Sequence, residues 1–516
     1  MGEAALSAYP PAMRRLAVLL LLAVAACGAG GGHDTTLRAD VVGDLGDPAS
    51  GPRAVLTQST QLGLVQFDGK GQIVPGLAAS WRVVDNGRSL IFRLREAKWS
   101  DGRALRAGDV VQVFRRIVAT GSRNPLKPLL AGIDNAPAIM AGRAPASLLG
   151  VTAPLDMVVE IRLSAPDTGL LELLATSQAA IVRGESRPPA IGAFQIADAG
   201  KRPLVLARNP RYFDAGDTAL GRVLLTAAPD AASGVARFLR GDTDLVIGDG
   251  IAGVGEARAN APRGTLRVEA AWGVYGYLAN QKTGPLADPR VRRALAMTID
   301  RDALIRDTLG LSEVAPLVSL VPPDAGSGDA APVPDWASVD ASGRAALAVQ
   351  LLGAAGYGAG RPLRLNVTLA PGREHIAILN AVAVMWAPLG VEVRAVARPP
   401  ALQRNAIAVG DYDLALVERT APAAQPLFFL RPFTCAGSAG RYCNPGADAL
   451  IDSARGMADE AGRTAALAQA ETAILADTPM IPLFVPARWA LVARNVGGWT
   501  ANRGGQHPLA ALNKSQ

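Results

Sequence analysis

Few side chains in this sequence are spaced for catalysis. The 516 residues include three histidines, His33, His375 and His507, and these are far apart. A general base is most often a histidine, so there are few candidates for that role. The G-x-S-x-G nucleophile elbow, the H-E-x-x-H zinc motif and the P-loop lysine motif do not occur in the sequence. We therefore expect no enzymatic activity, no metal site and no cofactor.

Two short patterns resemble catalytic groups only superficially. Ser438 lies in Gly437-Ser438-Ala439-Gly440, a spacing that does not form a nucleophile elbow. Asp411 and Asp413 form a close carboxylate pair, but such a pair is more typical of a turn than of a glycosidase.

A glycine pattern imitates a dinucleotide site. Residues 248–253 read G-x-G-x-x-G after a strand predicted at 245–247, and Glu269 follows at about the distance of a ribose-binding acid. Pro262 and Gly264 leave room for only about two turns of helix. A pyrophosphate site needs a longer helix whose N-terminal amides face the phosphate. The sequence therefore disfavours this interpretation.

The N-terminal residues form a targeting segment. Cys27 follows an apolar run, residues 16–26, which is preceded by two arginines and is too short to cross a bilayer. The run ends Val-Ala-Ala before Cys27 and resembles a lipobox, in which the cysteine thiol accepts a lipid. We expect residues 1–26 to be a lipoprotein signal peptide and residues 27–35 to be a tether. An ordinary secretory signal is the alternative.

The other two cysteines, Cys435 and Cys443, lie in one glycine-rich loop. Export would place them in an oxidising compartment, so we predict a disulfide between them. Two free thiols are the alternative. A metal pair is disfavoured because no histidine or third cysteine lies near them in the sequence.

Composition indicates a folded protein of more than one domain. Hydrophobic residues make up 49% of the chain and charged residues 19%, which excludes disorder as the main state. The net charge of +7 is spread thinly, without a dense basic tract interleaved with aromatics, so we expect no nucleic-acid partner. After the leader, no stretch approaches eighteen apolar residues, so we expect membrane contact only through the lipid anchor.

Strand and helix patterns alternate along the chain, which indicates an α/β fold. Strands are predicted at 37–42, 89–95, 157–163, 204–207, 222–227, 245–247 and 363–369. Helices are predicted at 110–117, 233–240, 290–297, after Asp300, at 376–386 and at 460–475. Residues 320–345 are rich in Pro, Gly, Ala and Asp, and are predicted to form a surface loop.

Five blocks of motifs recur in a characteristic order. They are residues 75–110 (PGLA, FRLR, WSDG and DV), 192–213 (GAF and LARNP-x-YF), 240–245 (RGDTDL), 280–301 (NQK, DPRVRRAL and IDR) and 442–483 (YCNP and PMIPL). In this order and spacing the chain resembles the extracellular solute-binding proteins of family 5, the oligopeptide, dipeptide and nickel class, which serve ABC importers.

The resemblance implies a two-lobed periplasmic-binding-protein type II fold with an extra domain in the N-terminal lobe. Lobe I would comprise residues 36–57, 186–271 and 489–516, the extra domain 58–185, and lobe II 272–488, with chain crossings near 271 and 488. Ligand would bind between the lobes and be buried by closure. We accordingly expect a monomeric, lipid-anchored periplasmic protein that captures a small solute and delivers it to an ABC permease complex. By its resemblance to the family, the expected solute is a peptide.

The resemblance also implies a departure at the ligand site. In peptide binders of this family an aspartate of the second lobe pairs with the ligand's α-ammonium. Aligning Asp413, Pro426 and Leu430 places Arg419 at a family tryptophan and Pro422 at that aspartate. A proline side chain can neither accept nor donate a hydrogen bond, so the anchor is missing.

Several interpretations remain open. In the first, Glu418 replaces the missing aspartate and the ligand is a peptide. In the second, Arg419 faces the cleft and pairs with a carboxylate or phosphate of an anionic ligand or modified peptide. In the third, Arg419 is solvated at the cleft rim. Trp272, Tyr275 and Tyr277, just past the first crossing, either line the cleft or belong to the core. A secreted interaction protein that keeps the fold but has lost import is a second hypothesis.

Overall fold

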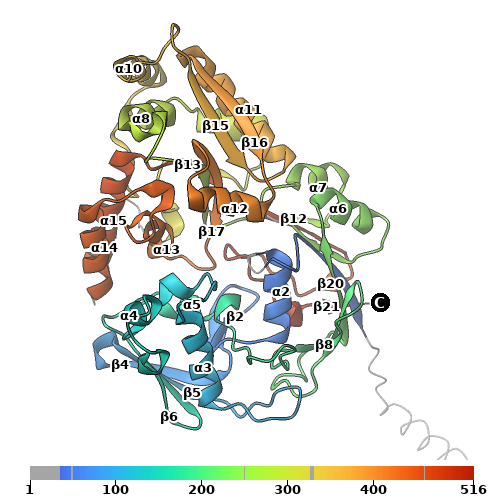
Figure 1. The fold of residues 1–516 in the computed structure, drawn as a ribbon. Helices are drawn as coiled ribbons and strands as arrows, with labels where there is room; N and C mark the ends of the chain where they lie inside the picture. Colours follow the sequence, from blue (N-terminus) through green and yellow to red (C-terminus); the bar gives the residue numbers. More distant parts are fainter. Residues whose placement is uncertain (1–34, 48–49, 249, 326–330, 458, 516) are drawn as a thin grey trace, which may run out of the picture.

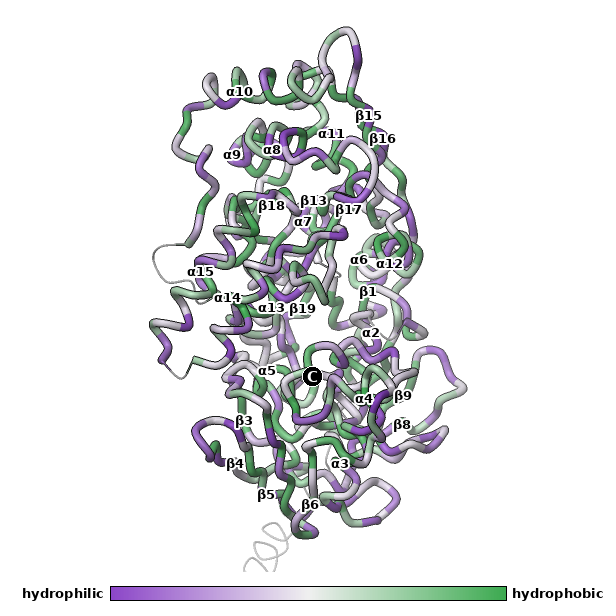
Figure 2. Tube along the Cα trace, turned by 60° about the vertical axis from the view of Figure 1, so that its left-hand side comes forward, coloured by the Kyte–Doolittle hydropathy of each residue, from purple (hydrophilic) through white to green (hydrophobic). Residues whose placement is uncertain are grey.

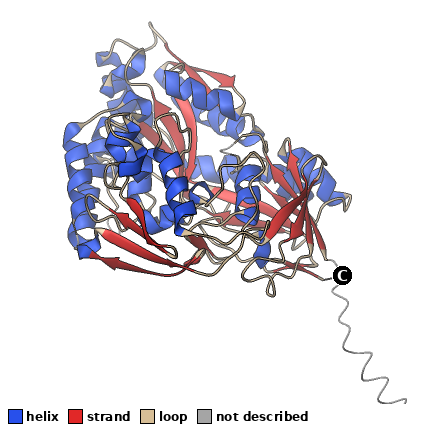
Figure 3. Cartoon of the chain, turned by 60° about the horizontal axis from the view of Figure 1, so that its bottom comes forward, coloured by secondary structure: helices blue, strands red, loops and turns tan. Residues whose placement is uncertain are grey.

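The computed structural model describes residues 35–47, 50–248, 250–325, 331–457 and 459–515. The predicted signal peptide, and the tether up to residue 34, lie outside the described residues. Figure 3 shows helices and strands mixed throughout the chain, and this confirms the predicted α/β class.

A seven-stranded sheet forms the first part, which we call lobe I. β1 (Thr36–Val42) is central and pairs in parallel with β10 (Arg222–Ala228) and β11 (Leu245–Ile247). Leu37, Ala39 and Val41 of β1 are buried on alternate positions, as an alternating strand requires. The order is β12-β19-β11-β1-β10-β9-β8, with outer strands β12 (Leu266–Ala270), β19 (Ala487–Val492), β9 (Leu204–Arg208) and β8 (Phe194–Asp198).

A six-stranded sheet forms the second part, lobe II. β13 (Gly273–Ala279) is buried along its whole length because β17 (Leu414–Thr420) and β18 (Met480–Val485) pair with it on either side. The order is β14-β18-β13-β17-β15-β16, completed by β14 (Ala315–Pro316), β15 (Leu363–Leu369) and β16 (Val391–Ala397).

A four-stranded antiparallel sheet forms the third part, the extra domain. Its order is β4-β5-β7-β6, with β4 (Ala78–Val84), β5 (Ser89–Leu94), β7 (Val158–Arg162) and β6 (Val151–Leu155). Two short pairs stand apart: β2 (Val65–Phe67) with β3 (Ile73–Pro75), and β20 (Val496–Gly497) with β21 (Asn513–Lys514).

Helices cover the sheets in all three parts (Figure 1). Lobe I has α2 (Gly51–Thr60), α6 (Ala231–Leu239) and α7 (Val254–Asn260). The extra domain has α3 (Ala107–Val118), α4 (Ala136–Met140) and α5 (Leu170–Leu174). Lobe II has α8 (Pro289–Met297), α9 (Arg301–Ala303), α10 (Ala341–Ala354), α11 (Arg373–Trp386), α12 (Pro400–Val409), α13 (Pro426–Leu430), α14 (Pro445–Gly456) and α15 (Glu460–Asp477).

Local signals set many of these boundaries. The side chain of Asp288 caps α8 by accepting a hydrogen bond from the amide of Arg290 at 2.9 Å, and Pro289 occupies the first turn. Asp459 caps α15 in the same way through the amide of Gly462, at 2.7 Å. In the hydropathy colouring of Figure 2, most strands of both lobes show green segments where they run through the interior.

The prediction of a surface loop at 320–345 is wrong in part. Residues 323–325 and 335–338 form single 3-10 turns, and α10 begins at Ala341. Leu320, Val321 and Trp336 are buried, so this stretch contributes to the core of lobe II. Short turns lack the periodicity that marks longer helices, and proline and glycine therefore suggested a loop.

The chain passes between the two large sheets twice, and the two passages are adjacent. One lies between β12 and β13, at residues 271–272, and the other at Pro486, between β18 and β19. The amide of Ala271 donates to the carbonyl of Pro486 at 2.9 Å. The second passage is thus two residues before the position expected near 488. We keep the three-part domain division as a proposal.

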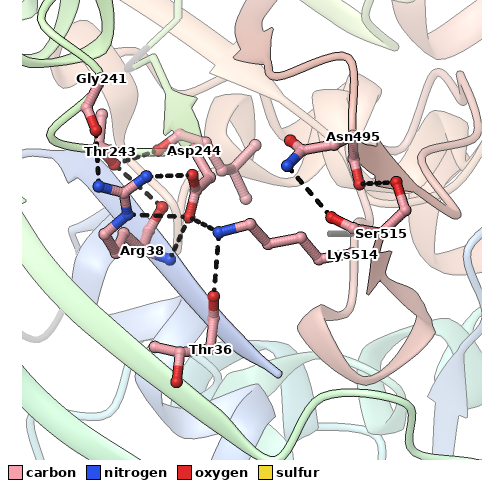
Figure 4. Close-up of polar contacts among 9 residues, drawn as sticks. Thr36, Arg38, Gly241, Thr243, Asp244, Asn495, Lys514 and Ser515 are labelled. Atoms are coloured by element: carbon pink, nitrogen blue, oxygen red, sulfur yellow. Dashed lines mark hydrogen bonds and ion pairs between the residues drawn. The ribbon is translucent and has the colours of Figure 1, made fainter. Parts of the chain in front are cut away.

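The C-terminal segment is fixed to lobe I by an ionic network around Asp244 (Figure 4). Arg38 donates from its guanidinium to both carboxylate oxygens of Asp244, at 2.6 and 3.1 Å. The ammonium group of Lys514 donates to Oδ2 of Asp244 at 2.8 Å and to the carbonyl of Thr36 at 3.2 Å. Burial favours a higher pKa for Asp244, but these hydrogen bonds outweigh it and lower the pKa.

Candidate functional site

Two carboxylates of lobe II bind the loop that follows β11 in lobe I. Glu374, in the first turn of α11, accepts hydrogen bonds from the amides of Gly253 at 2.8 Å and Gly255 at 3.1 Å. Glu418, on β17, accepts one from the amide of Ile251 at 3.0 Å. These contacts join the lobes, so the structure shows them closed against one another.

This same loop is the G-x-G-x-x-G segment, and the side chains of Trp489 and Glu374 already contact its described residues. A Cβ atom on Gly248 would lie 2.3 Å from Cε2 of Trp489, so the indole ring packs directly on the loop. α7 has seven residues, and Glu374 already occupies its first amides. Glu269 instead accepts a hydrogen bond from Nε1 of Trp499 at 2.8 Å. These contacts support the rejection of a dinucleotide site.

Further ion pairs link the lobes at their edges. Arg404 of α12 lies 2.5 Å from Asp47 of lobe I. Arg503, near the C-terminus, pairs with Asp324 of lobe II. Exposed pairs of this kind contribute little individually, whereas the contacts of Glu374 with Gly253 and of Glu418 with Ile251 are partly buried.

The two candidate tyrosines lie in the core of lobe II. Tyr275 is fully buried, its ring stacks on Phe484 with centroids 4.4 Å apart, and its hydroxyl lies 3.0 Å from Nδ1 of His375. Tyr277 is 1% exposed and packs near Trp386. Burial raises the pKa of both phenols. Of the two alternatives for these tyrosines, the structure favours the core.

Trp272 and Arg419 lie closer to the junction of the lobes. The backbone amide of Trp272 donates to the carbonyl of Arg503 at 3.0 Å, and its own carbonyl accepts from Ala421 at 2.7 Å. Arg419, on β17, is half-buried, and burial lowers its pKa to about 10. Among the described residues, no hydrogen bond or ion pair of its guanidinium is found.

A small cavity of about 30 Å³ lies between the extra domain and lobe II. Asp167 and Glu172 line one side, and Pro422, Gln425 and Arg431 line the other. Arg431 lies 3.2 Å from Asp167, and Gln425 donates to Oε1 of Glu172 at 3.1 Å. Burial raises the pKa of Glu172, and the nearby charge of Asp167 raises it further.

Sequence reasoning missed Glu172 and Glu374. Glu172 stands in Leu170-Leu171-Glu172-Leu173-Leu174, and a single carboxylate within an apolar run is a signal that the carboxylate is buried. Glu374 carries no comparable signal, because its partners are main-chain amides more than one hundred residues away in sequence.

Cys435 and Cys443 are joined by a disulfide in the structure. Cys27, the candidate lipid acceptor, lies outside the described residues. Over the described ranges, no group of three or more His, Cys, Asp or Glu side chains could hold a metal ion. Nor is any helix there sufficiently long and apolar to span a bilayer.

Comparison with known proteins decides the family. The model of the bacterial extracellular solute-binding proteins, family 5 (middle), matches residues 72–440. The chain belongs to this family. The family consists of solute-binding proteins, so the expectation that the chain is not an enzyme is confirmed.

Two relatives from Escherichia coli K12 are similar to this family 5 solute-binding protein over most of its length. It is 31% identical to the probable deoxycholate-binding periplasmic protein YgiS over 458 residues, 85% of this chain and 84% of the relative. It is 30% identical to the periplasmic murein peptide-binding protein MppA, with the same coverage.

Solved structures confirm the predicted two-lobed fold. The solute-binding protein superposes on the murein tripeptide binding protein MppA of E. coli with a TM-score of 0.85 at 27% identity, covering 93% of this chain and 99% of that one. Against MppA in its unliganded open form, the TM-score is 0.69, with 93% and 98% coverage. The lower score for the open form agrees with the hydrogen bonds that join the lobes here.

Proposed function

We propose that this protein is the periplasmic binding subunit of an ABC importer, which captures a peptide or peptide-like solute and encloses it by closure of lobe II. The observation that carries the proposal is the binding of Glu374 and Glu418 of lobe II to the 251–255 loop of lobe I. Such contacts form when the lobes approach one another and break when the lobes separate, as a protein that closes around its ligand requires.

Relatives named for oligopeptides, such as OppA of Salmonella typhimurium at 28% identity, favour a peptide, whereas the two relatives described above differ in their named solute. MppA is named for murein peptides and YgiS for deoxycholate, yet their identities to this chain differ by one per cent. The cavity beside Pro422 also includes carboxylate, amide and guanidinium groups among mainly apolar neighbours. A steroid acid offers far fewer donors to such groups than a peptide does.

Mass spectrometry of solute that co-purifies with the native mature protein tests the proposal, followed by calorimetric titration with the identified compound. Small-angle scattering should then show contraction of stripped protein when this compound is added. Chemical conversion of the bound compound, or a scattering profile unchanged by every co-purified compound, would contradict capture by closure.

A second candidate is an anionic solute held by Arg419. Its support is the half-buried guanidinium, for which the described residues supply no carboxylate partner. A buried cation without a counter-charge is costly, and a ligand carboxylate or phosphate would offset that cost. Arg419→Ala should then weaken binding of the co-purified compound about tenfold; an unchanged affinity would remove this candidate. Arg441→Ala, which alters an exposed arginine of the same lobe, is the control.

We also propose that Cys27 carries the lipid that holds the protein at the membrane. Cells labelled with palmitate should yield a labelled protein in the membrane fraction, and Cys27→Ser should abolish the label. Retention of the label in that variant would contradict the lipid site. We further propose a monomer, which light scattering of the purified soluble form checks.

A further inference from the structure

The cavity between the extra domain and lobe II is small, about 30 Å³, which is room for a head group of roughly the size of two water molecules. Its walls come from parts of the chain that are far apart in sequence. α5 and the loop before it supply Asp167 and Glu172, whereas residues 421–431, around α13, supply the opposite wall. Figures 1 and 2 both show α5 next to α13.

One ion pair in the cavity is already satisfied. Arg431 donates to Oδ2 of Asp167 at 3.2 Å and to the carbonyl of Leu129 at 3.2 Å. The other oxygen of Asp167 accepts from the amide of Gly169 at 3.0 Å. The charges of Asp167 and Arg431 therefore offset one another.

Glu172 is the remaining charged group that lines the cavity. Its Oε1 accepts a hydrogen bond from Nε2 of Gln425 at 3.1 Å. Its Oε2 is buried and has no hydrogen-bond partner among the described residues. A buried acceptor without a donor is destabilising, and a buried carboxylate more so. Burial raises the pKa of this carboxyl because it withdraws solvation from the charged form.

An ammonium group supplies what Oε2 lacks. It carries one positive charge and N–H donors in a small volume, whereas a quaternary ammonium has the charge without the donors. With Asp167 and Arg431 offsetting one another, Glu172 is the carboxylate of the cavity lining that has no lining guanidinium as its partner.

We propose that Oε2 of Glu172 receives a primary ammonium group of the captured solute, such as the N-terminus of a peptide. This assignment rests on the proposed capture of a peptide-like solute and specifies which end of it enters the cavity. The anchor then comes from the extra domain, so ligand binding couples this domain to lobe II.

Equilibrium dialysis of the mature protein tests the assignment with two probes: an equimolar pool of random tripeptides, and the same pool acetylated on all amines. We expect the wild type to retain the free-amine pool at least tenfold better than the acetylated pool. Glu172→Gln keeps an acceptor for Gln425 but removes the charge, and should bring the two pools to equal retention. Glu96→Gln, an exposed carboxylate of the same domain, should leave the ratio unchanged.

A second variant distinguishes the loss of an ammonium-binding charge from a structural effect of the Glu172→Gln substitution. Pro422 lines the same cavity, so Glu172→Gln combined with Pro422→Asp should restore part of the preference for free amines. Equal loss of both pools in Glu172→Gln, or equal retention of both pools by the wild type, would overturn the assignment while leaving peptide capture intact. Retention of neither pool by the wild type would overturn peptide capture and the assignment with it.

Discussion

The carboxylate of Glu374 lies 2.8 Å from the backbone nitrogen of Gly253, across the boundary between lobe II and lobe I. The same carboxylate also accepts from Gly255 at 3.1 Å. One side chain of lobe II therefore satisfies two main-chain donors at the start of α7, where a negative charge also complements the helix dipole.

Removing this side chain should shift the lobes toward an open arrangement. Glu374→Ala deletes two charge-assisted hydrogen bonds, and we expect about tenfold weaker ligand binding, since about 1.4 kcal/mol of closure energy is lost. Small-angle scattering should show a larger radius of gyration at subsaturating ligand. Glu392→Ala, which removes an exposed glutamate of lobe II paired with Arg364, is the control and should change neither quantity. Identical scattering of both variants would contradict this role.

A methyl group in the loop should displace the carboxylate of Glu418 and so weaken its contact between the lobes. Gly250 has φ of 61°, and a Cβ placed there would lie 2.4 Å from Oε1 of Glu418. We expect Gly250→Ala to weaken ligand binding more than Gly241→Ala, measured by titration calorimetry. Gly241 has a similar φ of 73° but has no neighbouring heavy atom within 4 Å of its Cβ position, so it controls for backbone strain. Equal effects of the two variants would mean that strain alone is responsible.

Glu471 should make stability fall as pH rises. This residue is buried in lobe II, and burial raises its pKa to about 7, although the amides of Leu320 and Val321 donate to its Oε1. The folded state then keeps a proton that the unfolded state releases above about pH 4.3. Stability is lost between that pH and about pH 7, by about 3 kcal/mol.

Glu471→Gln should remove this pH dependence, because the amide keeps an acceptor and cannot ionise. Urea unfolding midpoints should be higher than wild type at pH 8 and similar at pH 4. Glu460→Gln, an exposed position on the same helix, should follow the wild type. A wild-type midpoint that is flat from pH 4 to pH 8 would contradict the buried-carboxyl argument.

The network around Asp244 should have the opposite dependence on pH. The pKa of Asp244 is lowered, so its contribution is present above the unfolded value of about 3.9 and is lost as pH falls through the folded pKa. Asp244→Asn should cost about 2 kcal/mol at pH 7, because Arg38 and Lys514 lose their buried partner. Unfolding midpoints at pH 7 and pH 3 check this, with Asp242→Asn as the exposed control. A deficit of equal size at both pH values would exclude the ionic explanation.

Breaking the bridge between Cys435 and Cys443 should lower stability by about 2–3 kcal/mol, because it frees a short loop in the unfolded chain. The double variant Cys435→Ala, Cys443→Ala should unfold at lower urea than wild type under oxidising conditions. Added reductant should bring the wild type to the same midpoint and leave the variant unchanged. If reductant lowers the midpoint of the variant as well, the effect does not come from this bridge.

Local sequence patterns predicted the elements whose limits are set by neighbouring residues. Asp288 and Pro289 mark the start of α8 because a cap and a fixed φ act within one turn. Leu363 to Leu369 predicted β15 with the same limits because alternation is a property of the strand itself. The motif blocks predicted the family, and the match to its model confirms this.

The site could not be predicted to the same depth, because its contacts join residues distant in sequence. Nothing near Glu374 indicates that its partners are glycine amides 119 and 121 positions earlier. The position of Tyr275 just past the first chain crossing was compatible with the cleft or with the core, and only its packing on Phe484 and His375 places it in the core. Glu172 depends on Gln425, 253 positions away, for its hydrogen bond.

The attachment of Lys514 to Asp244 and Thr36 has a practical consequence for watching this molecule work. A fluorescent dye attached at the C-terminus would report the position of lobe I, although lobe I contains the first strand of the described chain. A second dye at Val384, which is 72% exposed on α11, would move with lobe II. The distance between the two labels would then follow single opening and closing events in real time.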